Sequence, residues 1–451
     1  MLHRVCWPIA FALVLVALLA WACAPAAAPA PTVAPPAVAG ATPPPPVATT
    51  APPGATTAPA KTKLEIFSWW TTGGEAAGLL KLYDLYNKQY SNVEIINATV
   101  AGGAGFQAKP ALKARMLGGD PPDSFQVHMG HELIDTWVTT GFMEPLDDIY
   151  KSEGWDKIFP KGVLDIVSYD GHYWSVPVNI HRANVLWYNK KVLADNNLQP
   201  PQTFADFFNA AEALKAKGIT PLALGDNGPW ASVHLFETVL IGTMGAEKYN
   251  GLWTGKTDWK GAEVKQSLDN FKKMLAYVNS DHSALTWDQA NDLVLSGKAA
   301  MTIMGDWVDA DNIAKQKADV EGWTLAPGNA GVYDALSDTF GLPKGAKNRD
   351  NVVGWLKLIG SKAGQEAFNP VKGSVCARAD CDPKLFGPYL QSAMQDWTKD
   401  TIVPSLAHGA AASEGWVTGL TDVVSVFVTK QDVDAAQKGL AQACVDAKVC
   451  R

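Results

Sequence analysis

The chain after residue 60 alternates between two hydrophobic patterns. Residues 63–70 alternate as a strand does and stop at a Thr-Thr-Gly-Gly turn, and residues 75–90 then carry apolar side chains at helical spacing. Residues 93–100 predict a second strand, a helix follows through residues 113–117, and residues 124–128 predict a third strand. Strands that alternate with helices predict an α/β fold with a mostly parallel, doubly wound sheet.

The same alternation continues along the rest of the chain. Further strands are predicted at residues 184–189, 221–224, 299–304 and 336–342, and further helices at 203–216, 351–359 and 413–447. This segment is far longer than one ordinary core of about 100–200 residues, so we expect two domains. No repeat of fixed period is present.

The N-terminus has the pattern of a secretory signal. His3 and Arg4 precede an apolar run from Val5 to Ala22, small residues surround Cys23, and no charged stop-transfer pattern follows. The flank resembles that of a lipoprotein, so we predict a signal peptide over residues 1–22 and a lipid on Cys23. A retained apolar anchor is the alternative. Either one places the mature protein outside the cytoplasmic membrane.

A low-complexity stretch follows Cys23. Residues 24–60 contain only Ala, Pro, Thr, Val and Gly. Without aromatic or charged side chains, such a stretch cannot offset the entropy of ordering. Residues 23–63 are therefore predicted to be the lipidated Cys and a tether that keeps a globular body near a membrane partner.

Charge and cysteine content indicate which partners to expect and whether the cysteines are oxidised. The net charge is −7 and no cluster of Lys and Arg is present, so nucleic acid is not an expected partner. Four cysteines remain after the signal and the lipid site: Cys376, Cys381, Cys444 and Cys450. Outside the cell an even set predicts disulfides, and the simplest pairing joins the neighbours in sequence, although three connectivities are possible. A zinc site is the alternative, but the spacing matches no usual finger.

The two sequence motifs that could indicate a cofactor or a catalytic metal are both incomplete. Gly103 and Gly105 loosely resemble a dinucleotide fingerprint, but the third Gly is missing and Pro110 disturbs the helix start. A His-Glu pair begins at His131, yet Asp135 stands where a zincin needs its second His. We expect no cofactor, no metal and no catalytic residue.

Five segments deserve comparison as a set: Trp69–Glu75, Leu117–Asp123, Gly297–Trp307, Ser337–Pro343 and Phe368–Gly373. Together they resemble the family 1 extracellular solute-binding proteins of ABC sugar importers, which are the maltose-binding-protein-like class. They occur in the expected order, and the similarity extends over about residues 64–428. Within that family the segments resemble the glucose/galactose-binding proteins in particular.

The resemblance implies a fold and a mode of action. It implies a type II two-lobe clamp, with a ligand cleft between α/β lobes and several hinge crossings. The N-terminal lobe would take residues 64–178 plus 330–375, and the C-terminal lobe residues 179–329 plus 376–451. A monomer would capture a monosaccharide by lobe closure and deliver it to the permease subunits of an ABC transporter.

The resemblance also implies the residues of the sugar site. These are Trp69, Trp70, Glu75, Gln126, His128, Trp287, Trp307, Asp338, Lys372 and His408. Their types suit a pyranose, because aromatic faces cover its C–H faces while carboxylate, amide, imidazole and ammonium groups bond its hydroxyls. Successive strand residues face opposite sides, so one of Trp69 and Trp70 is expected to pack inward and the other to face the cleft.

An enzyme is the alternative class of function. A surface-anchored glycosidase needs two carboxylates that flank the scissile bond, and Glu75 and Asp338 could be imagined in that role. An oligosaccharide-binding protein is a further alternative, and glucose is not separated from galactose or mannose. The chain itself is expected to act in the periplasm or on the outer face of the cytoplasmic membrane.

Overall fold

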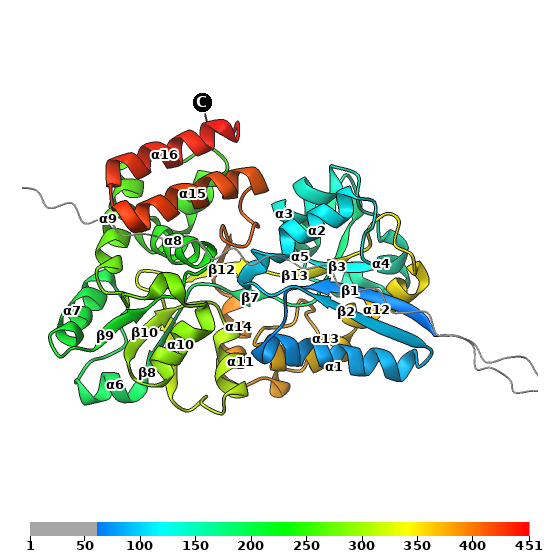
Figure 1. Cartoon of the computed structure of the whole chain (residues 1–451), viewed down its shortest axis with the longest axis horizontal. Coiled ribbons are helices and arrows are strands. Elements are labelled where there is room, and N and C mark those ends of the chain that lie inside the picture. The colour runs from blue at the N-terminus through cyan, green and yellow to red at the C-terminus, as the bar shows by residue number, and fades with distance from the viewer. Residues whose placement is uncertain (1–60, 451) are drawn as a thin grey trace, which may run out of the picture. The chain divides into compact units, whose positions relative to one another are not determined.

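The first sheet is assembled from strands that lie far apart in the sequence (Figure 1). In the computed structural model, which describes residues 61–450, its order is β2 (Val93–Thr99), β1 (Thr62–Ser68), β3 (Ser124–His128), β13 (Asp338–Gly341) and β6 (Ser175–Pro177). The predicted signal peptide, Cys23 and the tether as far as residue 60 lie outside the described residues.

A second sheet and two smaller ones complete the strands. The second sheet has the order β11 (Glu321–Leu325), β8 (Val185–Asn189), β10 (Ala299–Ile303) and β9 (Thr220–Ala223). A third sheet has the order β14 (Thr401–Pro404), β12 (Val332–Leu336) and β7 (His181–Arg182), and β4 (Ser168–Tyr169) pairs with β5 (His172–Tyr173).

The strand directions correct the prediction of mostly parallel sheets. β1 is parallel to β2 and β3, but β13 is antiparallel to both β3 and β6. In the second sheet β9 and β10 are parallel, while β8 is antiparallel to β10 and β11. One of the antiparallel strands, β13, returns to the first sheet from a distant part of the chain. A hydrophobic pattern marks such a segment as a strand but carries no information on its direction.

Helices surround the sheets, with α1 and α2 on opposite sides of the first sheet (Figure 1). The helices are α1 (Gly73–Gln89), α2 (Ala108–Leu117), α3 (His131–Leu133), α4 (Asp147–Glu153), α5 (Lys161–Ile166), α6 (Lys190–Asp195), α7 (Phe204–Lys215), α8 (Trp230–Trp253), α9 (Ala262–Leu275), α10 (Trp287–Leu295), α11 (Trp307–Ala314), α12 (Arg349–Gly360), α13 (Lys362–Lys372), α14 (Pro388–Trp397), α15 (Glu414–Lys430) and α16 (Val433–Asp446). Among the described residues, none of these helices combines the length and apolar character that a membrane crossing requires.

Local chemistry explains where several elements begin and end. The Thr203 side chain accepts a hydrogen bond from the Asp206 amide, and Asp206 accepts in return from the Thr203 amide, so this capping box starts α7 as predicted. The tail differs from the single predicted helix. Gln431 adopts a left-handed conformation that ends α15, and Asp432 then caps α16.

The predicted strand at residues 336–342 is also divided. The chain leaves the third sheet at Leu336 and enters the first sheet at Asp338, so Ser337 is the point of crossing. Because both halves are apolar and buried, nothing in the hydrophobic pattern signals that the strand changes its partners. This crossing makes Asp338 the first residue of β13, an inner strand of the first sheet.

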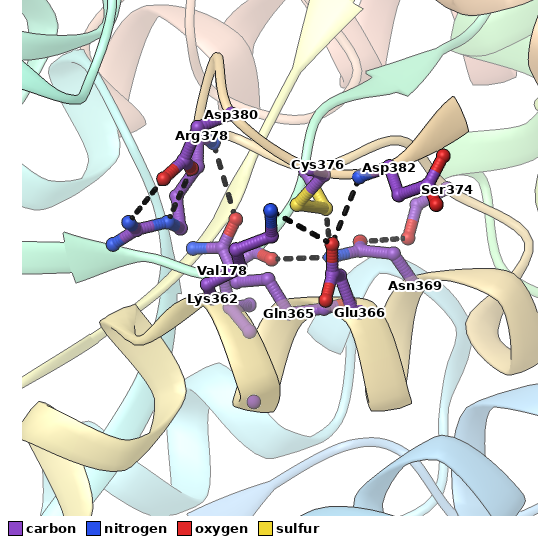
Figure 2. The surroundings of a disulfide bond; sticks show 12 residues. Val178, Lys362, Gln365, Glu366, Asn369, Ser374, Cys376, Arg378, Asp380 and Asp382 are labelled. Carbon is purple, nitrogen blue, oxygen red and sulfur yellow. Dashed lines mark hydrogen bonds and ion pairs between the residues drawn. A yellow bond between two sulfur atoms is a disulfide. The ribbon is translucent and has the colours of Figure 1, made fainter. Parts of the chain in front are cut away.

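Both disulfides join neighbours in sequence, which is the simplest of the pairings considered. Cys376 pairs with Cys381, and Cys444 pairs with Cys450. Figure 2 shows that the first of these loops lies against α13. The Arg378 amide donates to Gln365 Oε1 at 3.1 Å, and α13 in turn donates from Asn369 to the Val178 carbonyl oxygen at 3.0 Å. The disulfide loop therefore braces the helix that ends at Lys372.

Candidate functional site

Polar side chains gather where elements of the first sheet end. Trp69 follows β1, His128 ends β3, and Asp338 begins β13. Glu75 lies in the first turn of α1, and Lys372 is the last residue of α13. Strand ends and helix termini converge here, which is the place where open α/β sheets bind ligands.

The opposing side is mostly aromatic. Trp230, Trp287 and Trp307 are the first residues of α8, α10 and α11, His181 lies on β7, and His408 follows β14. The two sides enclose a cavity of about 20 Å³. Its lining consists of Trp69, Glu75, Gly103, Ala104, His128, His181, Trp230, Trp287, Trp307, Leu336, Asp338, Lys372 and His408.

The Asp338 carboxylate is held by hydrogen bonds on both oxygens. Gln126 Nε2 donates to Oδ1 at 2.7 Å, and Asn179 Nδ2 donates to Oδ2 at 2.8 Å. His181 Nε2 lies 3.4 Å from Oδ2. Burial alone would raise the pKa of Asp338, but the His181 bond and the Lys372 charge hold that pKa well below its usual value. Asp338 is therefore an anionic acceptor at neutral pH.

Lys372 connects the Glu75 carboxylate to His181 on β7. Its Nζ lies 3.1 Å from Glu75 Oε1 and 3.0 Å from His181 Nε2, and its side chain is almost fully buried. Burial raises the pKa of Glu75, although the Lys372 charge acts in the opposite direction. Gly373 caps α13 at φ +75°, where an added Cβ would lie 2.8 Å from Ala310 Cβ, so the end of the helix that carries Lys372 requires glycine.

A second ionic group supports His128 from behind. His128 Nδ1 lies 2.8 Å from Glu132 Oε2, and Lys109 Nζ lies 2.7 Å from the same oxygen. Burial would raise the pKa of Glu132, but the charges of Lys109 and His128 outweigh it and lower that pKa to about 2. The Glu132 carboxylate thus fixes the His128 ring, which packs 4.9 Å from the Trp69 ring.

The aromatic side is organised around Trp307. Its ring lies 5.4 Å from His181, 5.4 Å from His408, 6.3 Å from Trp230 and 6.4 Å from Trp287, measured between centroids. These tilted and edge-on contacts are the arrangements that aromatic pairs prefer. Within residues 61–450, the buried Trp307 Nε1 has no hydrogen-bond partner. This side offers ring surface and an unused donor.

Two of the predicted site residues do not line the cavity. Trp70 packs against Phe340 and Phe368 in the core of the first sheet, while Trp69 faces the cavity, so the tandem pair divides as the strand geometry requires. Gln126 lies behind Asp338, where its Oε1 accepts from the Trp69 amide at 3.1 Å. The other eight predicted residues surround the cavity.

Comparison with known proteins identifies the chain. The model of the bacterial extracellular solute-binding protein family matches residues 64–366. The chain belongs to this family. It is 38% identical over 378 residues to an uncharacterised ABC transporter extracellular-binding protein of Pyrococcus horikoshii, covering 83% of this chain and 85% of that protein. It is 34% identical over 400 residues to a probable sugar-binding periplasmic protein of Mesorhizobium japonicum, covering 86% and 94%.

A solved structure gives the fold. The bacterial solute receptor AcbH, described as exclusive for β-D-galactopyranose, superimposes with a TM-score of 0.76 at 18% identity, covering 86% of this chain and 99% of that one. The solute-binding protein has the α/β fold of periplasmic binding proteins. As a member of this family it is an extracellular solute-binding protein and not an enzyme.

Sequence reasoning missed five lining residues of the solute-binding protein, and two of them, His181 and Trp230, have polar or aromatic side chains. His181 stands between two buried positions, Ile180 and Arg182, and its sequence neighbours gave no helical or strand motif to mark it. Its Nδ1 bonds to Asp306, which fixes the ring in the cavity wall. Trp230 follows Gly228-Pro229, which are typical helix-start residues, so a tryptophan at the start of a helix was the available signal.

One buried cluster has side chains of the metal-ligand type. The ligand atoms of His234, Glu237 and His408 lie within 4.8 Å of one another. The Ser405 hydroxyl bonds to Glu237 Oε1 at 2.9 Å and lies 2.8 Å from His408 Nδ1, so it occupies the space between these two. Ser405 thus links Glu237 and His408 by hydrogen bonds, whereas neither ring nitrogen of His234 has a hydrogen-bond partner within residues 61–450, and we assign no metal to the cluster.

Proposed function

We propose that the protein binds a monosaccharide, glucose or galactose, in the 20 Å³ cavity. The observation that carries the proposal is the pairing of an ionised acceptor, Asp338, with aromatic rings on the opposite side of one small cavity. A carboxylate accepts from sugar hydroxyls, and rings such as Trp69 and Trp287 cover the apolar C–H faces. The galactopyranose receptor that shares the fold supports the choice of a single ring.

Binding requires the two sides to separate first. A cavity of about 20 Å³ holds about one water molecule and not a sugar ring. We propose that residues 64–178 plus 330–375 form one lobe and residues 179–329 plus 376–451 the other, with hinge motion between them. X-ray scattering should show an expanded sugar-free protein that contracts when D-glucose or D-galactose is added. An unchanged profile at saturating sugar would contradict the clamp.

Calorimetric titration tests the choice of sugar. D-Glucose, D-galactose, D-mannose, maltose and cellobiose should each be titrated into the protein, and one of the first two should bind tightest with one sugar per chain. Chromatography of the mixture should show unchanged sugar, as expected of a receptor. Tightest binding to a disaccharide would reject the monosaccharide proposal.

A larger neighbouring cavity makes a longer sugar the second candidate. This cavity of about 350 Å³ shares Ala104 and Trp230 with the smaller one and adds Phe106, Trp137 and Glu414 to its walls. A second ring would lie there. Phe106→Ala should then weaken disaccharide binding and leave monosaccharide binding unchanged, whereas Tyr169→Ala, an equally exposed aromatic outside both cavities, should change neither.

We propose that the mature protein is held at the membrane by a lipid on Cys23, where it delivers the sugar to permease subunits. The apolar run before Cys23 and the proline-rich stretch after it support this proposal. Mass spectrometry of the membrane-extracted protein should find a diacylglyceryl cysteine as the first residue. An intact N-terminus, or cleavage within residues 24–60, would contradict it.

A further inference from the structure

The loop that carries His408 is anchored by one buried carboxylate of α8. Glu237 Oε2 accepts from the amides of Leu406 at 2.5 Å and Ala407 at 2.9 Å, and Glu237 Oε1 accepts from the Ser405 hydroxyl at 2.9 Å. Glu237 and Ser405 are fully buried, and neither lines the sugar cavity. Three donors that point at one side chain fix the position of the loop.

The same contacts set the direction of the hydrogen bonds. Ser405 has a single hydroxyl hydrogen. If that hydrogen goes to the Glu237 carboxylate, Ser405 Oγ can only accept from His408 Nδ1, which lies 2.8 Å away. His408 then carries its proton on Nδ1. Its Nε2, which has no hydrogen-bond partner within residues 61–450, is left as an acceptor.

The charge states of the neighbours agree with this direction. Burial, with the charges of His128 and His234 acting the same way, holds the pKa of His408 well below its usual value, so the ring is neutral and has one proton to place. The Asp334 carboxyl faces Glu237 from β12. Burial and the nearby Glu237 raise the pKa of Asp334 well above its usual value. Glu237 accepts three hydrogen bonds, whereas neither Asp334 oxygen has a hydrogen-bond partner within residues 61–450, so the proton of this pair lies on Asp334.

We propose that Glu237 and Ser405 are positioning residues that fix the tautomer of His408, so that the receptor presents an unprotonated Nε2 to the cavity and selects a ligand hydroxyl that donates there. The inference rests on the proposed function for its ligand. It needs no contact between Glu237 or Ser405 and the sugar. The His408 ring would then accept a hydrogen bond from a ligand hydroxyl, and Glu237 would determine this through Ser405 without contacting the ligand.

Glu237→Gln provides an isosteric test. The Gln carbonyl oxygen can still accept from the Leu406 and Ala407 amides, so the loop anchor is kept. The Gln NH2 group, however, donates to Ser405 Oγ, and the Ser405 hydrogen must then point at His408 Nδ1. The variant therefore reverses the hydrogen-bond chain and moves the His408 proton to Nε2.

The first arm of the experiment is nitrogen-15 NMR of the imidazoles in the sugar-free protein at pH 8. This pH lies above the value of about 7 to which burial raises the pKa of Glu237. Wild-type His408 should be protonated on Nδ1, and in Glu237→Gln and Ser405→Ala the proton should move to Nε2. Ser425→Ala, which removes a hydroxyl bonded only to a helix carbonyl, is the matched control and should leave the signal unchanged.

The second arm is calorimetric titration of the same proteins with D-glucose. Glu237→Gln and Ser405→Ala should each weaken binding about 3- to 10-fold, and Ser425→Ala should not. A wild-type His408 protonated on Nε2, an unmoved proton in Glu237→Gln, or a moved proton with unchanged affinity would each overturn the inference. If wild-type protein does not bind D-glucose, D-galactose replaces it in this arm; failure to bind either sugar would contradict the proposed function alone, because the NMR arm needs no ligand.

Discussion

The two sides of the cavity differ in what holds them. On the side of the first sheet, Asp338, Lys372 and His128 are ionic or polar groups whose partners lie within the protein at 2.7–3.1 Å. On the opposite side, Trp287 and Trp307 contact their neighbours through ring faces and edges at 5.4–6.4 Å between centroids. We call these the polar side and the aromatic side.

The difference separates two tasks of a sugar site. Buried charges need fixed partners, because an unpaired one costs several kcal/mol, so the polar side must be rigid before any ligand arrives. Ring surfaces gain from any apolar face that covers them and tolerate small shifts. We expect changes on the polar side to affect both stability and affinity, and loss of the half-buried Trp287 ring on the aromatic side to affect affinity far more than stability.

Asp338→Asn should have the largest effect. The substitution removes the charge opposite Lys372 and His181 and places an NH2 group against the donors of Gln126 or Asn179. We expect stability to fall by about 3–5 kcal/mol, as for other broken buried ion pairs, and sugar affinity to fall about 10- to 100-fold. Chemical denaturation and calorimetry measure the two effects. Unchanged stability would remove Asp338 from the rigid polar side.

Glu132 should make the polar side sensitive to acid. Its pKa is lowered to about 2 in the folded protein from 4.5, so it contributes stability above pH 4.5 that is lost as the pH falls from there towards 2. The shift corresponds to about 3 kcal/mol. Denaturation measured at pH 7, 4 and 3 should show this loss, and Glu132→Gln should be less stable at pH 7 and less sensitive to acid. Equal pH dependence in the two proteins would contradict the ion pair.

The two disulfides offer a matched comparison. They close loops of similar length, with sequence separations of 5 and 6, so removal of either one should cost about 2 kcal/mol. Only the Cys376–Cys381 loop braces α13, which positions Lys372. The Cys376→Ser, Cys381→Ser protein should therefore also bind sugar more weakly, while the Cys444→Ser, Cys450→Ser protein should bind normally. Equal affinities would show that α13 does not need this brace.

Trp287→Ala should have the smallest effect on stability. Trp287 is half-buried, and its loss should weaken sugar binding by about 1 kcal/mol while the melting temperature changes little. Trp323→Ala, an exposed tryptophan outside the cavity, is the control and should affect neither quantity. A large loss of stability in Trp287→Ala would erase the distinction between the two sides.

The sequence predicted the elements better than their connections. The helix after Thr203 and the strand at residues 124–128 could be read from a helix-capping threonine and from apolar residues that alternate with polar ones, because both depend on local chemistry. The change of sheet at Ser337 could not, because the chain remains buried and extended on either side of it.

The sequence also predicted the location of the site better than the contacts of its individual residues. Family motifs marked eight residues that surround the cavity, but not His181, whose place depends on its bond to Asp306 from a distant part of the chain. They also placed Trp70 and Gln126 on the ligand, whereas the structure puts the first in the core and the second behind Asp338. Motifs thus locate a site, while tertiary contacts decide which of its residues face inward.

A crystal structure with D-glucose or D-galactose tests the central claim most directly. We predict density for one pyranose ring between Trp69 and Trp287, with hydroxyls within hydrogen-bond distance of Asp338 and His408 and the two sides farther apart than in the 20 Å³ cavity. Density confined to the larger cavity beside Phe106 and Trp137, with Asp338 and His408 still bonded only to protein, would contradict the account.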